Sequence, residues 1–149
     1  MTPSHQVVHL RIPASPEFIV VARLAVSGVA SRMNFTVEEI EDIKIALSEA
    51  CTNAIQHGYI SQKEGASMVD IAFLVHADRI EITVKDTGIG FDPLNVTSKK
   101  TQELSEEQFG LGLGLAFINN LMDESDIQSK PGDGTMVKMV KYLTQTIPA

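Results

Sequence analysis

The stretch Asp86-Thr87-Gly88-Ile89-Gly90, with Gly110-Leu111-Gly112-Leu113-Gly114 about twenty residues later, decides the fold of this chain. An acidic residue before glycines at a strand end can accept a hydrogen bond from a nucleobase amino group while the backbone packs close to the ligand. A glycine-rich turn that runs into a helix presents free N–H groups and a positive dipole end to phosphates. The two motifs, in this order, predict a nucleotide-binding site.

Glu49 and Asn53 precede these motifs and lie one turn apart on a predicted helix. The apolar stripe of that helix is about 100–180° round from Glu49, so we expect the pair to face a cleft or solvent. A carboxylate there is suited to act as a general base, and an amide oxygen to bind a hard cation. Alone, this spacing is more typical of a solvated helix face, and only the downstream glycine motifs favour a site.

Both glycine motifs also have a purely structural interpretation. Asp-x-Gly is a common turn, and Gly110, Gly112 and Gly114 suit a hinge without a ligand. Their position just before a predicted helix favours phosphate binding, although no Gly-Lys-Ser/Thr follows and the motif is not a P-loop. Lys99 and Lys100 lie between the motifs, where they either reach a γ-phosphate or remain solvated.

Hydrophobic periodicity predicts an α+β fold with a mixed, mostly antiparallel sheet and helices on one face. Ser15-Pro16 and the capping box Thr36-Val37-Glu38-Glu39 predict two helix starts. Residues 91–109 show no periodicity, and so long a connection is typical of a functional or disordered loop. The predicted strands span residues 6–12, 68–75, 80–86, 126–129 and 135–143, and the predicted helices span 16–33, 36–57 and 113–122.

Composition indicates one domain over residues 1–149, with 12 basic and 19 acidic residues and a net charge of −7. This acidic field disfavours direct nucleic-acid binding. The single cysteine, Cys51, excludes an intramolecular disulfide and a cysteine-based metal cluster, and its apolar surroundings predict a core residue. No apolar run approaches the ~20 residues of a membrane span, so we expect a cytoplasmic protein without a membrane partner.

The order of the motifs resembles that of the GHKL ATPase/kinase superfamily. Within it, the chain looks most like the bacterial anti-sigma-factor serine kinases of the RsbW and SpoIIAB types, over roughly residues 6–143. The matching motifs are Glu49/Asn53, Asp86-x-Gly88-x-Gly90, Gly110-x-Gly112-x-Gly114 and Gly134-Thr135, and the matching stretches are Ala30–Met33, Glu39–Lys44, Ser48–Ala54 and 121–143.

This resemblance implies a Bergerat fold, in which ATP binds between a helix and a mobile lid, here at about residues 91–112. It implies that Glu49 activates the attacking hydroxyl as a base and that Asn53 binds Mg²⁺. It further implies that Asp86 binds the adenine amino group, helped through water by Thr135. The other implied ATP contacts are Gly88 and Gly90, where the backbone approaches the nucleotide, and Gly110, Leu111, Gly112, Leu113 and Gly114, which hinge the lid and cradle phosphates.

Members of that family phosphorylate a serine of a small STAS-type anti-anti-sigma protein, and they bind a sigma factor, usually as homodimers. The resemblance therefore implies an ATP- and Mg²⁺-dependent protein-serine kinase that is also an anti-sigma factor. One alternative is a non-catalytic ATP-binding switch, which would not need the Glu49 carboxylate. Another is the catalytic domain of a two-component histidine kinase, but the predicted helix at Pro16–Met33 offers no phosphoacceptor histidine.

Overall fold

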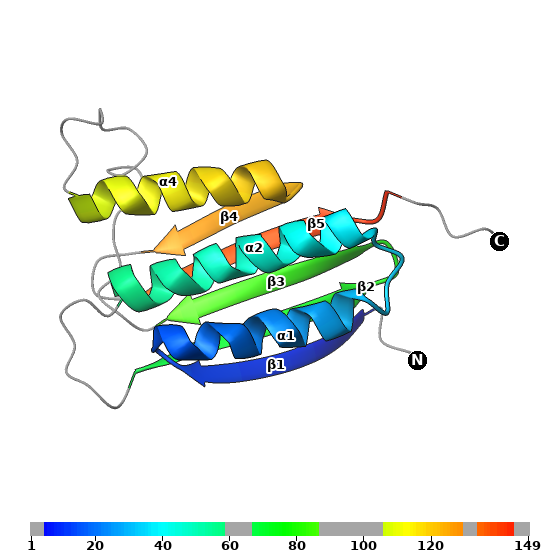
Figure 1. Cartoon of the computed structure of the whole chain (residues 1–149), viewed down its shortest axis with the longest axis horizontal. Coiled ribbons are helices and arrows are strands. Elements are labelled where there is room, and N and C mark those ends of the chain that lie inside the picture. The colour runs from blue at the N-terminus through cyan, green and yellow to red at the C-terminus, as the bar shows by residue number, and fades with distance from the viewer. Residues whose placement is uncertain (1–4, 59–66, 87–105, 130–133, 145–149) are drawn as a thin grey trace.

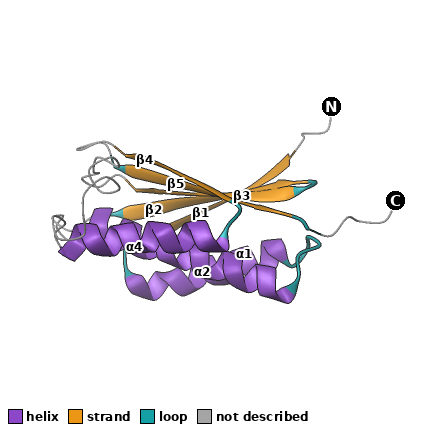
Figure 2. Cartoon of the chain, turned by 90° about the horizontal axis from the view of Figure 1, so that it is seen from above, coloured by secondary structure: helices purple, strands orange, loops and turns teal. Residues whose placement is uncertain are grey.

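The computed structural model describes residues 5–58, 67–86, 106–129 and 134–144. These residues form a five-stranded sheet in the order β1-β2-β3-β5-β4, and helices α1, α2 and α4 lie together on one face of it (Figures 1 and 2). The strands are β1 (His5–Pro13), β2 (Met68–His76), β3 (Arg79–Asp86), β4 (Glu124–Ser129) and β5 (Thr135–Tyr142), and the helices are α1 (Ile19–Ala30), α2 (Val37–Asn53) and α4 (Glu106–Leu121).

The sheet confirms the predicted α+β architecture, with one difference. Each of the four neighbouring strand pairs among the described residues is antiparallel, so the parallel component expected of a mixed sheet is not found there. β2 and β3 form the predicted hairpin, in which Phe73 lies opposite Ile82. Both side chains are fully buried, because every second residue of a strand faces the helices.

The capping box predicted at the start of α2 is present. The Thr36 side-chain oxygen accepts a hydrogen bond from the Glu39 N–H at 3.1 Å, and a Glu39 carboxylate oxygen accepts one from the Thr36 N–H at 2.8 Å. Two of the helix's unpaired N–H groups are thereby satisfied. At the other end a π-helical turn, η2 (Ala54–Gly58), continues the chain to the glycine where the sequence predicts the stop.

The first predicted helix is shorter than expected. A 3-10 turn, η1 (Pro16–Phe18), precedes α1, and α1 ends at Ala30 rather than near Met33. Ser15 makes no side-chain cap; its carbonyl instead accepts the Phe18 N–H at 3.0 Å, which closes the tight turn. Proline suits this start because it lacks the N–H that a first helical turn leaves unpaired.

Helix α4 corrects the prediction for the second glycine motif. It begins at Glu106, not near Leu113, so Gly110, Gly112 and Gly114 lie inside a helix rather than in a turn before it. Each interior glycine costs about 1 kcal/mol relative to alanine, and packing of the buried Ile118 against the core offsets part of this cost.

Helices α2 and α4 contact each other and run in opposite directions (Figure 1). Lys141, at the end of β5, donates a hydrogen bond to the Leu121 carbonyl at the end of α4. Thr144, just beyond β5, donates one to the Glu39 carboxylate at the start of α2. The end of α2, the end of β3 and the first half of α4 therefore meet at the other end of the molecule.

No helix in the described part of the chain combines the length and the apolar character that crossing a membrane requires.

Candidate nucleotide-binding site

Two buried polar side chains mark the end of the molecule where α2, β3 and α4 meet. Asn53, the last residue of α2, is 7% exposed, and Asp86, the last residue of β3, is 3% exposed. Among the described residues, no other polar or charged side chain is buried. Burying polar groups is costly unless they are matched by partners. Their concentration at one end of an otherwise apolar core indicates a functional site.

Asn53 is buried against α4, which differs from the expected orientation towards a cleft or solvent. A Cβ placed on Gly114 would lie 2.9 Å from Asn53 Nδ2 and 3.0 Å from Oδ1, so the backbone of α4 passes directly beside this amide. The Asn53 Nδ2 is buried and has no hydrogen-bond partner among the described residues. Helical periodicity identifies the side of α2 that packs on the sheet. It does not show that α4 covers the neighbouring side of α2, which carries Asn53.

Asp86 and Thr135 lie opposite each other in the pairing of β3 with β5. Residues in this position project to the same face of the sheet, so the Thr135 hydroxyl lies on the same side as the buried Asp86 carboxylate. The expected partnership of these two positions is therefore compatible with the sheet register.

Ser129, which the sequence analysis did not identify, positions Thr135. Its hydroxyl lies 2.7 Å from the Thr135 hydroxyl, and it donates a hydrogen bond to the Gly134 carbonyl at 3.0 Å. A signal for this contact is present in the sequence: Ser129 ends one predicted strand and Thr135 begins the next. Antiparallel neighbours in such positions pair with each other, as these two do in the structure. Without a register, however, the sequence does not show which serine faces the site.

Glu49 lies one helical turn before Asn53 and is half-buried. Among the described residues, the acidic partners in ion pairs are Asp70, Glu41, Glu81 and Asp78, and Glu49 is not one of them. Between Glu49 and Asn53, Cys51 faces the opposite flank and is fully buried. Burial raises the pKa of the Cys51 thiol to about 12, which leaves it protonated at neutral pH and confirms that it is a core residue.

The remaining predicted site residues are described in part. Gly110, Leu111, Gly112 and Leu113 belong to the first half of α4. Gly88 and Gly90 lie outside the described residues, as do Lys99, Lys100 and positions 91–105 of the expected lid.

The described residues fit a nucleotide with its metal ion. A buried carboxylate at a strand end supplies an acceptor for an amino group, and the Thr135 hydroxyl supplies a donor or acceptor beside it. Mg²⁺ usually takes only one or two protein ligands and completes its shell with water and phosphate oxygens. The Asn53 amide provides one such oxygen, and its unpartnered Nδ2 indicates that the contacts of this group extend beyond the described chain.

Comparison with known proteins identifies the family of this chain. The family described as histidine kinase-like ATPase domain matches residues 12–141. Serine-protein kinase RsbW of Bacillus subtilis (strain 168) is 44% identical over 91% of this chain and 85% of its own length. The protein of the same name from Bacillus pumilus is 41% identical over 97% of this chain and 91% of its own length.

A solved structure shows the same fold at lower identity. It contains the RsbU and RsbW domains of a Mycobacterium tuberculosis protein, and it matches with a TM-score of 0.66 at 20% identity. The match covers 91% of this chain, which spans about a third (32%) of that longer protein. The matched family and these relatives show that the chain belongs to the RsbW serine-protein kinases of the histidine kinase-like ATPase family.

Proposed function

We propose that this serine-protein kinase is an anti-sigma factor that uses ATP and Mg²⁺ to phosphorylate a serine of a STAS-type anti-anti-sigma protein. The observation that carries the proposal is the buried pair Asn53 and Asp86, with the half-buried Glu49 one turn away. This set provides a nucleotide anchor, a metal ligand and a base within one end of the fold.

Each described residue has one role in the proposal. Asp86 accepts a hydrogen bond from the adenine amino group, and Thr135, held by Ser129, assists through water. Asn53 contributes its amide oxygen to Mg²⁺, and Glu49 takes the proton of the seryl hydroxyl. ATP, when bound, supplies the phosphoryl group. Phosphoryl transfer depends mainly on positioning and charge stabilisation, and this chain's residues supply the positioning.

The glycine motifs complete the proposed nucleotide contacts. Gly114 lets α4 approach the Asn53 amide. The lid is proposed at about residues 91–112, and its last part coincides with the start of α4. The other proposed contacts are Gly88, Gly90, Gly110, Leu111, Gly112 and Leu113.

The proposed partners follow from the family. The chain acts as a homodimer in the cytoplasm, binds a sigma factor and releases it according to the state of the STAS-type protein. A net charge of −7 accords with a regulator that contacts proteins rather than DNA.

The test is transfer of the γ-phosphate of Mg²⁺-ATP to STAS-domain proteins from the same genome. We expect acid-stable phosphoserine with the unmodified chain. Glu49→Gln is expected to lower the rate by about 10²–10⁴-fold, the usual contribution of a general base, while ATP binding persists. Glu38→Gln, an exposed glutamate on the same helix, is the matched control and should transfer at the unmodified rate.

Transfer that persists unchanged in Glu49→Gln would remove Glu49 as the base. ATP binding without transfer to any STAS-domain protein would instead support the non-catalytic switch.

A further inference from the structure

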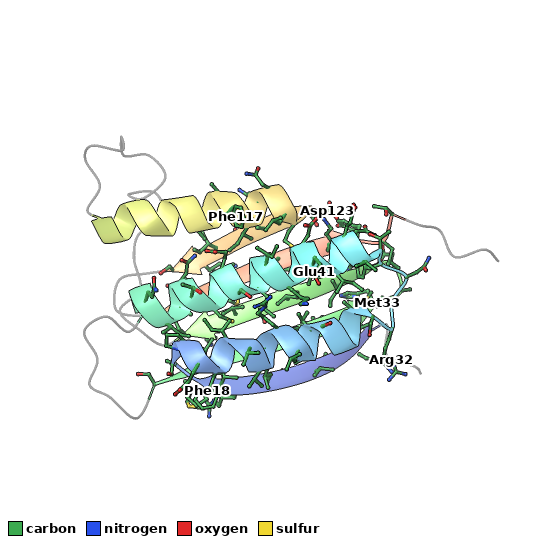
Figure 3. The ribbon with its side chains drawn as sticks, in the orientation of Figure 1. Phe18, Arg32, Met33, Glu41, Phe117 and Asp123 are labelled. Atoms are coloured by element: carbon green, nitrogen blue, oxygen red, sulfur yellow. The ribbon has the colours of Figure 1, made fainter. Side chains whose placement is uncertain are left out.

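Two exposed apolar side chains flank the outer side of the contact between α2 and α4. Ile45 on α2 is 37% exposed, and Phe117 on α4 is 45% exposed. Figure 3 shows Phe117 on α4, with α2 running beside that helix. Both side chains are exposed rather than packed into the core, so they offer apolar surface to a partner.

The close approach of Asn53 to Gly114 fixes how the two helices are aligned. Glu49 is four residues before Asn53, and Phe117 is three residues after Gly114. Because the helices are antiparallel, both steps run in the same direction, by about one turn. Phe117 therefore lies level with Glu49, and Ile45 follows one turn, about 6 Å, further along α2.

The side chains also lie on facing flanks. With about 100° per residue, Glu49 is about 40° round α2 from Asn53, towards the outer surface, and Ile45 is about 40° further. On α4, Phe117 is about 60° round from Gly114. Asn119, which hydrogen-bonds Ser125 of β4, marks the opposite flank of α4. Glu49 thus opens onto the outer surface between Ile45 and Phe117.

We propose that Ile45 and Phe117 form a docking patch for the segment of the substrate protein that carries the phosphoacceptor serine. This inference rests on the proposed function, because it takes Glu49 as the base. A base must come within about 2.6–3.2 Å of the hydroxyl that it deprotonates. The acceptor segment must therefore cross the surface where Glu49 emerges, and Ile45 and Phe117 border that surface.

The chemistry of the patch defines the segment that fits it. Ile45 and Phe117 suit an apolar side chain next to the serine, since aromatic residues are enriched among the contacts that dominate binding energy. Asp42 lies three residues before Ile45 and about 60° round from it, on the same side of α2, which gives the patch an acidic border. We therefore infer a segment with an apolar residue beside the serine and a basic residue beyond it, without acidic neighbours.

The experiment measures steady-state transfer to the STAS-domain protein used above, with Ile45→Ala and Phe117→Ala. Each variant is expected to raise the KM for the protein substrate about fivefold or more, the effect of removing a strong interface contact. The KM for ATP and the melting temperature should stay unchanged, because both side chains are exposed. Val37→Ala is the matched control, since Val37 is 78% exposed on the same helix but about 18 Å from Glu49.

The outcomes separate this inference from the proposed function. If the unmodified chain transfers phosphate but Ile45→Ala and Phe117→Ala behave like Val37→Ala, the docking patch is wrong and the kinase assignment stands. Leu24, 68% exposed on α1, tests the other apolar surface: a raised KM in Leu24→Ala alone would move docking to α1. If the unmodified chain transfers nothing, both proposals fail together.

Discussion

Gly114 matters for the side chain that it lacks. Its backbone passes within van der Waals reach of Asn53, and any Cβ there would be closer to the amide than side-chain atoms normally come. The glycine motif was predicted to act through backbone conformation and free N–H groups. Within the described structure, Gly114 acts through close packing of two helices instead.

Substituting Gly114 by alanine should separate binding from folding. The new methyl group must displace the Asn53 amide, so we expect Mg²⁺-ATP affinity to fall about tenfold or more, equivalent to about 1.4 kcal/mol. The same change raises the helix propensity of this position by up to about 1 kcal/mol. Because this gain offsets the cost of displacing the amide, the free energy of unfolding should change little. Isothermal titration and urea unfolding measure the two effects.

Gly28→Ala is the control for that comparison. Gly28 lies within α1, and a Cβ there would meet nothing within 4 Å. We expect it to gain up to about 1 kcal/mol of stability and to keep its ATP affinity. Equal ATP affinity in the two variants would contradict the close-packing role of Gly114.

At the scale of elements, local signals predicted most of the fold. Alternating residues located the β2–β3 hairpin, and Thr36 with Glu39 located the start of α2. The start of α4 was missed because glycines at every second position break the helical pattern. Ser105-Glu106-Glu107-Gln108 nevertheless has the spacing of a capping box and is the signal that could have found it.

The site could be predicted as a set of residues but not as an arrangement. Asn53 and Asp86 were identified from their motifs, yet the burial of Asn53 depends on α4, which is distant in sequence. Ser129 was missed for the same reason, because its contact with Thr135 depends on the register of β4 and β5. The burial of Asn53 and the contact of Ser129 with Thr135 both depend on residues from other elements. A single sequence does not show how far apart such residues lie in the fold.

The capping box of α2 should make stability depend on pH. Burial acts to raise the pKa of Glu39, but hydrogen bonds from Thr36 and Thr144 outweigh it, and the pKa lies below the ordinary value of 4.5. A lowered pKa contributes stability that is present above the unfolded-state pKa and is lost as pH falls through the folded-state pKa.

Glu39→Gln tests this, because glutamine also completes a capping box but does not titrate. Urea unfolding between about pH 6 and pH 3 should show a steeper loss of stability for the unmodified chain than for the variant. Parallel pH profiles would mean that Glu39 contributes nothing through its charge.

At the scale of the whole molecule, the helices of the described residues cover one face of the sheet and leave the other without a helix (Figure 2). The other face carries ion pairs: Arg11 pairs with Asp70 at 2.7 Å, and Arg79 with Glu81 at 3.3 Å. The core of the described residues therefore lies on the helix side, and the proposed nucleotide site is at one end of that layer.

Ligand binding at that end should stabilise the entire fold. At an ATP concentration 100 times Kd, the gain is about 2.7 kcal/mol, which for a chain of this size is a rise in melting temperature of about 5–10 °C. Asp86→Asn is expected to reduce this rise, because an amide presents its NH₂ as readily as its oxygen to the adenine amino group. Thermal unfolding with and without Mg²⁺-ATP measures it, and an undiminished rise in Asp86→Asn would contradict the adenine-binding role.

The strand order has a consequence for synthesis. β5 is the last of the five described strands to leave the ribosome, yet it lies between β3 and β4. Until it emerges, β4 lacks its only neighbour in the described sheet, and Asp86 lacks the residue opposite it. A nascent chain can therefore form the β2–β3 hairpin early, but it closes the described sheet, and with it the proposed nucleotide site, only after β5 has been made.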